Sequence, residues 1–138
     1  MKELSCFCTL DFKADMRRKD ILKRNYILPN YSLGTEGRIQ KEDEVLTEND
    51  QVVRLALERF QIPELLFNPT DGLIPQCGLH EAVHEAILRC NPVQQPILYR
   101  NIMAIGGNIE FPNFRARMLE GIRGMSTPVY TVYNIYTV

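Results

Sequence analysis

The sequence has no tryptophan, only two histidines and no internal repeat. No hydrophobic run approaches the roughly 20 residues of a membrane-spanning helix, and the first residues lack the apolar segment of a signal peptide. An excess of one charge is also missing, because 16 Lys and Arg face 17 Asp and Glu, a net charge of −1. This balance predicts no general attraction to nucleic acid or to a membrane. We expect an intracellular protein.

No Cys-x-x-Cys pair occurs among the four cysteines, Cys6, Cys8, Cys77 and Cys90. Neither the length nor the loop content indicates a small secreted scaffold that needs disulfides. We expect Cys6 and Cys8 on one face of a strand, and we interpret all four cysteines as buried free thiols. A disulfide between any two of them stays open.

The 138 residues are enough for one domain, and 45% hydrophobic with 24% charged residues is typical of a soluble α/β or α+β fold. Alternating strand and helix patterns after Gln51 favour α/β packing. We expect strands over 4–12, 26–33 and 130–138, a solvated helix or loop over 11–25, an exposed mobile connection over 34–48, and a strand followed by a turn over 51–60. We also expect a short helix starting at Pro63, the clearest helix over 79–90, a turn bracketed by Pro92 and Pro96, and a helix over 112–121.

The apolar run 102–105 stops at Gly106, Gly107 and Asn108. This pattern predicts a buried strand that ends in a glycine turn opening a helix. Two glycines permit a sharp turn and remove the Cβ atoms that would keep a flat ligand away, and a helix N-terminus offers unpaired N–H donors. The corner suits a nucleotide, although a tight turn without a ligand has the same pattern.

Residues His80, Glu81 and His84 form an H-E-x-x-H motif on the clearest predicted helix. In a metalloprotease the two histidines bind zinc and the glutamate is the general base. The chain has no other histidine, so a third ligand would be a carboxylate such as Glu110 or Glu120. A zinc-dependent hydrolase is therefore the alternative function, and a hydrated face of an amphipathic helix explains the same residues without metal.

Basic residues gather at Lys13, Arg17, Arg18, Lys19, Lys23 and Arg24. A cluster of this kind can bind phosphate or direct nuclear import, but solvated surface segments have the same composition.

Several separated blocks of the chain resemble the C-terminal half of the actin superfamily, in the same order. They are Lys2-Glu3 with Asp11-Phe12, Glu58-Arg59-Phe60 with Pro63-Glu64 and Leu66-Phe67, Gly78 with Glu81, and Gly106-Gly107 with Phe111-Pro112 and Arg117-Met118. The segment from Arg54 to Pro69 and the Gly106-Gly107-Asn108 triplet resemble the nuclear actin-related protein 6 branch of this superfamily. The resemblance implies a noncatalytic subunit of a nuclear complex that remodels chromatin and exchanges a core histone for its variant.

The resemblance also implies site residues. Gly106, Gly107 and Asn108 would back the adenosine of ATP or ADP, Phe111 would pack near the base, and Lys2 and Glu3 would approach the base and ribose. Asn113 stands where the family usually has glycine, which leaves the geometry of this loop open. No residue is expected to be catalytic or to bind metal.

In full-length relatives the phosphate-gripping hairpins precede the segment that this chain resembles. The expected fold is therefore a partial actin-like (ribonuclease H-like ATPase) α/β fold, a fragment with a subdomain 4-like part over 1–74 and a subdomain 3-like part over 75–138. We expect ATP or ADP in the full-length protein and none on the fragment alone. The expected partners are other subunits of the complex and, through them, chromatin and histones, with no membrane and no small-molecule substrate. The expected location is the nucleus, with the cytoplasm as a second possibility.

Overall fold

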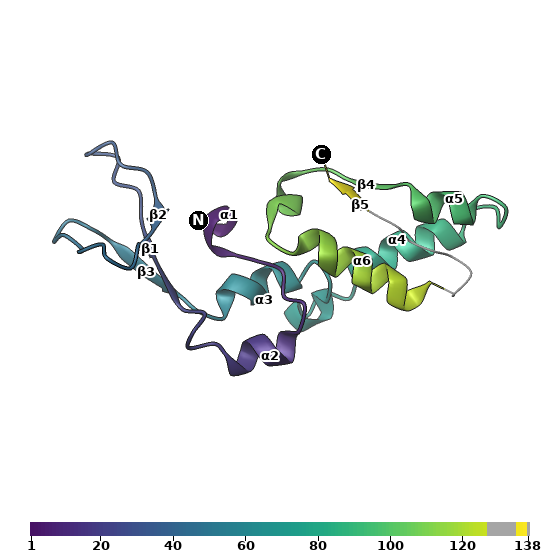
Figure 1. Cartoon of the computed structure of the whole chain (residues 1–138), viewed down its shortest axis with the longest axis horizontal. Coiled ribbons are helices and arrows are strands. Elements are labelled where there is room, and N and C mark those ends of the chain that lie inside the picture. The colour runs from purple at the N-terminus through teal and green to yellow at the C-terminus, as the bar shows by residue number, and fades with distance from the viewer. Residues whose placement is uncertain (127–134, 138) are drawn as a thin grey trace.

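The computed structural model describes residues 1–126 and 135–137, and these form an elongated mixed α/β molecule (Figure 1). The α-helices are α1 (Lys2–Ser5), α2 (Phe12–Arg17), α3 (Glu58–Glu64), α4 (Leu79–Leu88), α5 (Gln95–Arg100) and α6 (Phe114–Met125), and the 3-10 helices are η1 (Pro69–Gly72) and η2 (Gly107–Glu110). The strands are β1 (Arg24–Ile27), β2 (Arg38–Ile39), β3 (Val52–Leu55), β4 (Ile102–Ala104) and β5 (Ile135–Thr137). None of the helices in the described ranges is long and apolar enough to cross a membrane.

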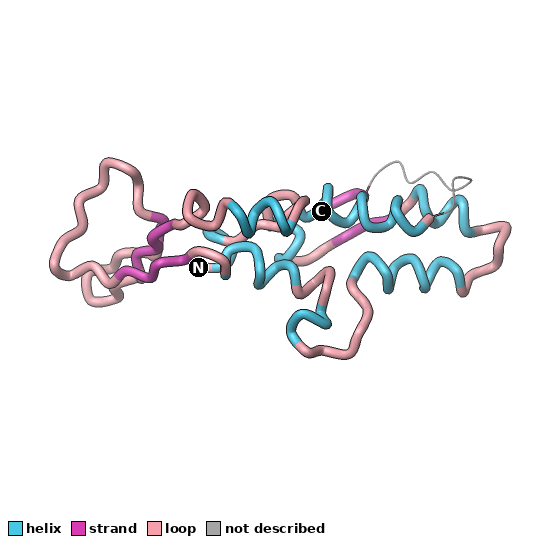
Figure 2. The backbone as a smooth tube through the Cα atoms, turned by 90° about the horizontal axis from the view of Figure 1, so that it is seen from below, coloured by secondary structure: helices cyan, strands magenta, loops and turns pink. Residues whose placement is uncertain are grey.

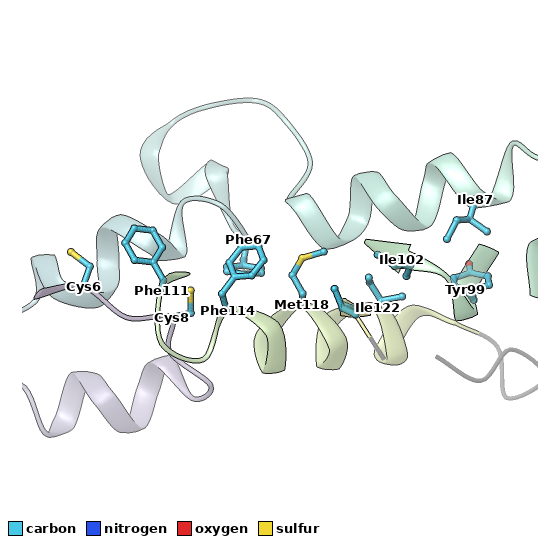
Figure 3. Close-up of a cluster of buried hydrophobic side chains, with 11 residues drawn as sticks. Cys6, Cys8, Phe67, Ile87, Tyr99, Ile102, Phe111, Phe114, Met118 and Ile122 are labelled. Atoms are coloured by element: carbon cyan, nitrogen blue, oxygen red, sulfur yellow. The ribbon is translucent and has the colours of Figure 1, made fainter. Parts of the chain in front are cut away.

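The hydrophobic core lies along α6 and between it and α4. Phe114, Met118 and Ile122 recur every four residues, which places them on one buried face of α6. Figure 3 shows the cluster extending along this helix, from Cys6 and Phe111 at one end to Tyr99 at the other. The N-terminal segment therefore shares a core with residues that follow it by more than a hundred positions.

The expected strand over 4–12 is wrong. Residues 2–5 form α1, and the chain then runs extended without a partner strand among the described residues. Its backbone donors bond to separate elements: the Phe7 N–H donates to the Arg59 carbonyl and the Cys8 N–H to the Pro112 carbonyl, both at 2.9 Å. The apolar pattern correctly marked burial, but burial in this segment comes from packing between elements.

The strand followed by a turn over 51–60 is confirmed by β3 and the start of α3, but the expected helix start at Pro63 is wrong. Pro63 lies near the end of α3. Proline has no N–H to donate to the carbonyl four residues earlier, which is that of Arg59. That carbonyl instead accepts the Phe7 N–H, so the proline frees the acceptor that holds the N-terminal segment.

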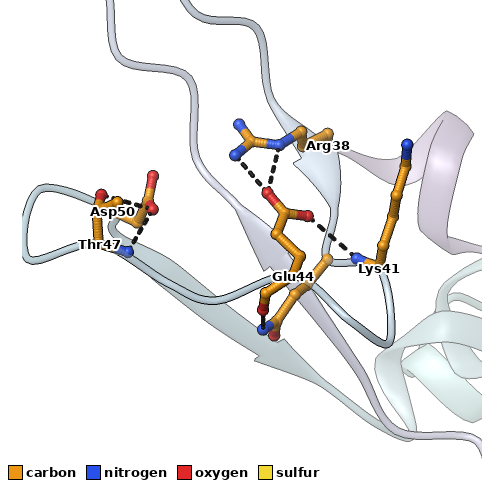
Figure 4. A network of polar contacts seen from close by, with 6 residues as sticks. Arg38, Lys41, Glu44, Thr47 and Asp50 are labelled. Carbon is orange, nitrogen blue, oxygen red and sulfur yellow. Dashed lines mark hydrogen bonds and ion pairs between the residues drawn. The ribbon is translucent and has the colours of Figure 1, made fainter.

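The three-stranded antiparallel sheet has the order β2-β1-β3 and lies at one end of the molecule (Figure 1). β1 is shorter than the strand expected over 26–33. The connection expected over 34–48 is largely exposed, but it contains β2, whose Ile39 lies opposite Tyr26. Side chains in this connection also pair with one another, as Arg38 and Glu44 do in Figure 4. The connection is thus partly ordered by its own polar residues.

At the other end, the helix expected over 79–90 is confirmed as α4, and that over 112–121 as α6 with later bounds. The turn expected between Pro92 and Pro96 is confirmed over residues 92–94. The helix α5, which the sequence did not predict, follows it with Pro96 in its first turn, where a missing N–H costs little. β4 pairs in parallel with β5. The remainder of the strand expected over 130–138 lies outside the described residues.

Candidate functional site

The glycine corner follows β4 and leads into η2. The helix that it opens is this short 3-10 helix, and α6 begins only at Phe114. Gly106 has a φ of 114°, a conformation that other residues rarely adopt. A Cβ atom built on Gly106 or on Gly107 would meet no atom within 4 Å. The backbone of this corner therefore has an open face.

The short helix α1 lies next to this corner (Figure 1). The Lys2 ammonium donates a hydrogen bond of 3.4 Å to the Asn108 side-chain oxygen, although 106 positions separate the two residues. Glu3 is exposed on the same helix. Four of the six residues expected at a nucleotide site, Lys2, Gly106, Gly107 and Asn108, are therefore gathered in one exposed place.

Phe111 has a different position. Only 5% of it is exposed, and it belongs to the core cluster with Cys6 and Cys8 (Figure 3). The next residue, Pro112, accepts the Cys8 N–H. Phe111 thus anchors the loop from within the protein, and its ring is not an exposed stacking surface.

The sequence left open whether Asn113, in place of the family's usual glycine, changes the geometry of this loop. Asn113 adopts φ 68° and ψ 0°, in the left-handed region. Glycine is the usual residue there, and asparagine is among the side chains that tolerate this conformation best. The exchange of glycine for asparagine therefore preserves the backbone turn into α6.

Arg59 holds the segment that carries α1. Its Nε donates to the Ser5 carbonyl at 2.7 Å, its Nη1 donates to the Leu22 carbonyl, and its guanidinium lies 5.3 Å from the centre of the Phe7 ring. One side chain thus joins α3 to the segment after α1 and to the segment before β1. This contact positions Lys2 relative to η2.

A buried ion pair joins α3 to α6. The Arg117 Nη2 lies 2.9 Å from Glu64 Oε1, and the Asn68 amide donates to the same oxygen at 2.5 Å. Glu64 is only 3% exposed. The sequence blocks contain Glu64 and Arg117, but periodicity marks neither as buried, so sequence reasoning missed this contact.

The cysteines divide into two buried and two exposed residues, and all four are free. Burial, together with the nearby Glu64 carboxylate, raises the pKa of the Cys8 thiol to about 12, and burial also raises the pKa of Cys6. These thiols stay protonated at neutral pH and are poor nucleophiles. Cys77 and Cys90 are exposed, which corrects the expectation that all four are buried.

The residues of the H-E-x-x-H motif have separate structural contacts. The Glu81 carboxylate accepts the Gly78 N–H at 2.7 Å and so caps the start of α4, and the His84 Nδ1 forms a hydrogen bond of 2.7 Å with the Tyr99 hydroxyl. His80 packs against Phe67, and burial lowers its pKa.

Within 1–126 and 135–137, no three His, Cys, Asp or Glu side chains are arranged to hold a metal ion. The zinc-hydrolase alternative is therefore unsupported.

The basic segment over 13–24 is exposed. Lys23 pairs with Asp20 at 2.6 Å, and Arg24 donates to the carbonyls of Ile21 and Lys23. These contacts are local to the segment, so its role in binding a partner stays a prediction.

The chain is similar to known proteins over nearly its whole length. A family model described as Actin matches residues 1–136. An actin-like protein of Caenorhabditis elegans is 36% identical over 135 residues, which cover 94% of this chain and 32% of that protein. Actin-related protein 6 of Drosophila melanogaster is 34% identical over 137 residues, 91% of this chain and 33% of that protein. Actin-related protein 6 of Arabidopsis thaliana is 33% identical over 147 residues, which cover 87% of this chain and 35% of that protein. The chain thus spans about a third of the length of these curated relatives.

Proposed function

The chain belongs to the actin family, and we propose that it is part of an actin-related protein that serves as a noncatalytic subunit of a nuclear chromatin remodelling complex. In this proposal the complex exchanges a core histone for its variant. The observation that carries the proposal is the similarity, over most of the chain, to proteins named actin-related protein 6 in several species. The family and its branch agree with the resemblance found in the sequence blocks.

The proposed division of the chain is a subdomain 4-like part over 1–74 and a subdomain 3-like part over 75–138. The sheet β1–β3 lies in the first part and α4–α6 lie in the second. Cys8 and Phe67 from the first part share a core with Phe114 from the second. This shared core supports a single partial actin-fold unit in which the two parts are not independent.

The proposed ligand of the full-length protein is ATP or ADP. Gly106, Gly107 and Asn108 would back the adenosine, and Lys2 and Glu3 would approach the base and ribose, with Phe111 anchoring the loop from behind. The open face at both glycines and the contact between Lys2 and Asn108 support this assignment. We assign no catalytic residue to the chain, because phosphoryl transfer needs groups around the phosphates and Mg²⁺ that the adenosine side does not supply.

A pair of glycine variants tests the nucleotide site. In the full-length protein, Gly107→Val places a branched side chain on the open face of the corner, and we expect at least a tenfold loss of affinity for fluorescent ADP. The matched control is Gly124→Val, because a Cβ at Gly124 in α6 also meets no atom within 4 Å. Equal ADP affinity for both variants and the unchanged protein would place the nucleotide elsewhere.

The subunit proposal is tested by size fractionation of a nuclear extract. An antibody against residues 34–48 should detect a polypeptide several times heavier than 16.0 kDa, in a very large assembly that contains a remodelling ATPase and histones. A free polypeptide in the small fractions would contradict the proposal. Deletion of 34–48 in the full-length protein then tests whether this connection contacts another subunit, since unchanged assembly would exclude it.

A further inference from the structure

A groove separate from the glycine corner lies between α2, α3 and η1. Its volume is about 560 Å³, within the range of pockets that hold side chains or small ligands. Figure 2 shows the loop that carries η1 projecting away from the neighbouring helices. This loop forms one wall of the groove and α3 forms another.

The floor of the groove is apolar and uncovered. Ile62 of α3 and Leu65, which follows α3, line it with 50% and 36% of their surface exposed, and Phe12 of α2 lies beside them. The Phe12 ring meets Phe60 edge to face at a centroid distance of 5.6 Å, which holds Phe12 in place. The groove therefore offers a preformed apolar surface.

The polar lining is acidic. Glu58 and Asp71 are exposed at the groove, and the nearly fully buried Glu64 also lines it. Arg117 and Asn68 bond to one carboxylate oxygen of Glu64, whereas its Oε2 has no hydrogen-bond partner among the described residues. This Oε2 is shielded from solvent, so Glu64 lies beneath the groove surface, and the exposed Glu58 and Asp71 carboxylates are the acceptors that a ligand can reach.

These features together specify the occupant. Among the described residues no lysine or arginine lines the groove, so the carboxylates of Glu58 and Asp71 disfavour an anionic ligand. The described residues hold no cluster able to bind a metal ion. An arginine or lysine side chain instead combines a cationic hydrogen-bond donor with an apolar stem that can lie on Ile62 and Leu65.

We propose that this groove binds a segment of a partner protein in which a basic residue is flanked by apolar residues. Its cationic group would lie between the exposed carboxylates of Glu58 and Asp71, and its apolar neighbours would cover Ile62 and Leu65. Arginine surrounded by apolar contacts is a frequent centre of protein interfaces. The inference rests on the proposed function only in that a noncatalytic subunit acts through its partners.

The test uses a fluorescein-labelled peptide of alternating leucine and arginine, titrated with the full-length protein and read by fluorescence polarisation. Glu58→Gln and Asp71→Asn keep the size of each side chain and remove its charge. We expect each substitution to raise the Kd about threefold and the pair to raise it about tenfold. Ile62→Gln tests the apolar floor and should weaken binding by a similar factor.

Matched controls make the outcome specific. Glu120→Gln and Asp43→Asn remove the same charges from exposed positions outside the groove and should leave the Kd unchanged. A peptide with glutamate in place of arginine should not bind. Circular dichroism of every variant separates loss of binding from loss of folding.

Three results would overturn the proposal. They are absence of binding to the folded protein, equal weakening by the groove and control variants, and light scattering that shows a dimer of the protein that Ile62→Gln dissociates. None of them depends on the nuclear fractionation, so failure here and failure of the proposed function are distinguishable.

Discussion

Different interactions stabilise the two ends of the molecule, the helical end and the sheet end. The helical end buries the core cluster along α6 and an ion pair between Glu64 and Arg117. The sheet β1–β3 contributes buried residues of its own, Tyr26, Ile27 and Leu55, but none of them belongs to that cluster. Its connections are held by polar pairs such as Arg38 with Glu44 (Figure 4). Apolar burial contributes far more free energy than exposed ion pairs, so the helical end should determine global stability.

The largest expected effect comes from an aromatic exchange at each end. Phe67→Ala removes a ring that is 1% exposed and packs against Phe114 and Arg117. We expect a loss of about 3–5 kcal/mol in the free energy of unfolding, measured by urea denaturation. Tyr31→Ala, at an 89% exposed position in the sheet end, should change it by less than about 0.5 kcal/mol. Similar losses for both variants would refute the claim that the helical end determines global stability.

The second effect concerns the buried ion pair. Arg117→Met leaves the Glu64 carboxylate buried without its cation, and we expect a loss of about 3 kcal/mol. Adding Glu64→Gln to this variant should recover part of the loss. Arg89→Met breaks the exposed pair with Glu85, whose side chains are 79% and 54% exposed, and should cost about 0.5 kcal/mol or less. If Arg117→Met lowered the free energy of unfolding no more than Arg89→Met does, the buried pair would be dispensable for stability.

The third effect is a pH dependence. The Cys8 thiol has a folded pKa of about 12 against an ordinary value of 9.0, so the unfolded chain releases this proton first as the pH rises. Stability is therefore lost above pH 9, by about 1.4 kcal/mol near pH 10. Chemical denaturation at pH 8 and near pH 10 measures this loss. Cys8→Ala should show a smaller decrease over the same interval, and an identical decrease would assign the effect to other groups.

The smallest effect tests the sheet end alone. Arg38→Met removes the ion pair with Glu44, and we expect faster hydrogen exchange at the Gln40 and Lys41 amides without a change in the unfolding midpoint. The Lys41 N–H donates to Glu44, and the Gln40 N–H donates to the Asn25 carbonyl. A shift of several degrees in the midpoint would mean that the polar connection supports the core as well.

Patterns of local periodicity predicted the elements that depend on local forces. The helix α4 and strand β3 were both predictable from the spacing of their apolar residues. The short helices α1 and α5 were not, because four or six residues carry too little periodicity and their stability comes from packing. Pro63 was misplaced because local sequence does not reveal that the carbonyl it leaves free, that of Arg59, accepts the Phe7 N–H from a distant segment.

The candidate site likewise has features that the sequence predicted and features that depend on tertiary contacts. The glycine pair marked the open corner directly, and the family resemblance brought Lys2 and Glu3 into the expected site. The contact of Lys2 with Asn108 depends on Arg59 holding the N-terminal segment. The burial of Phe111 was not predictable from its spacing, since the same aromatic residue could face either a base or the core.

The sequence by itself determined the family, the fold class, the position of the glycine corner and the polar character of the connection over 34–48. These properties follow from residue order, backbone freedom and local polarity, which require no knowledge of distant contacts. Only the tertiary structure decided that Glu64 meets Arg117, that His84 meets Tyr99 and that the acidic groove forms beside α3. Such contacts depend on which elements share space, and residues more than ten positions apart carry no local signal of their pairing.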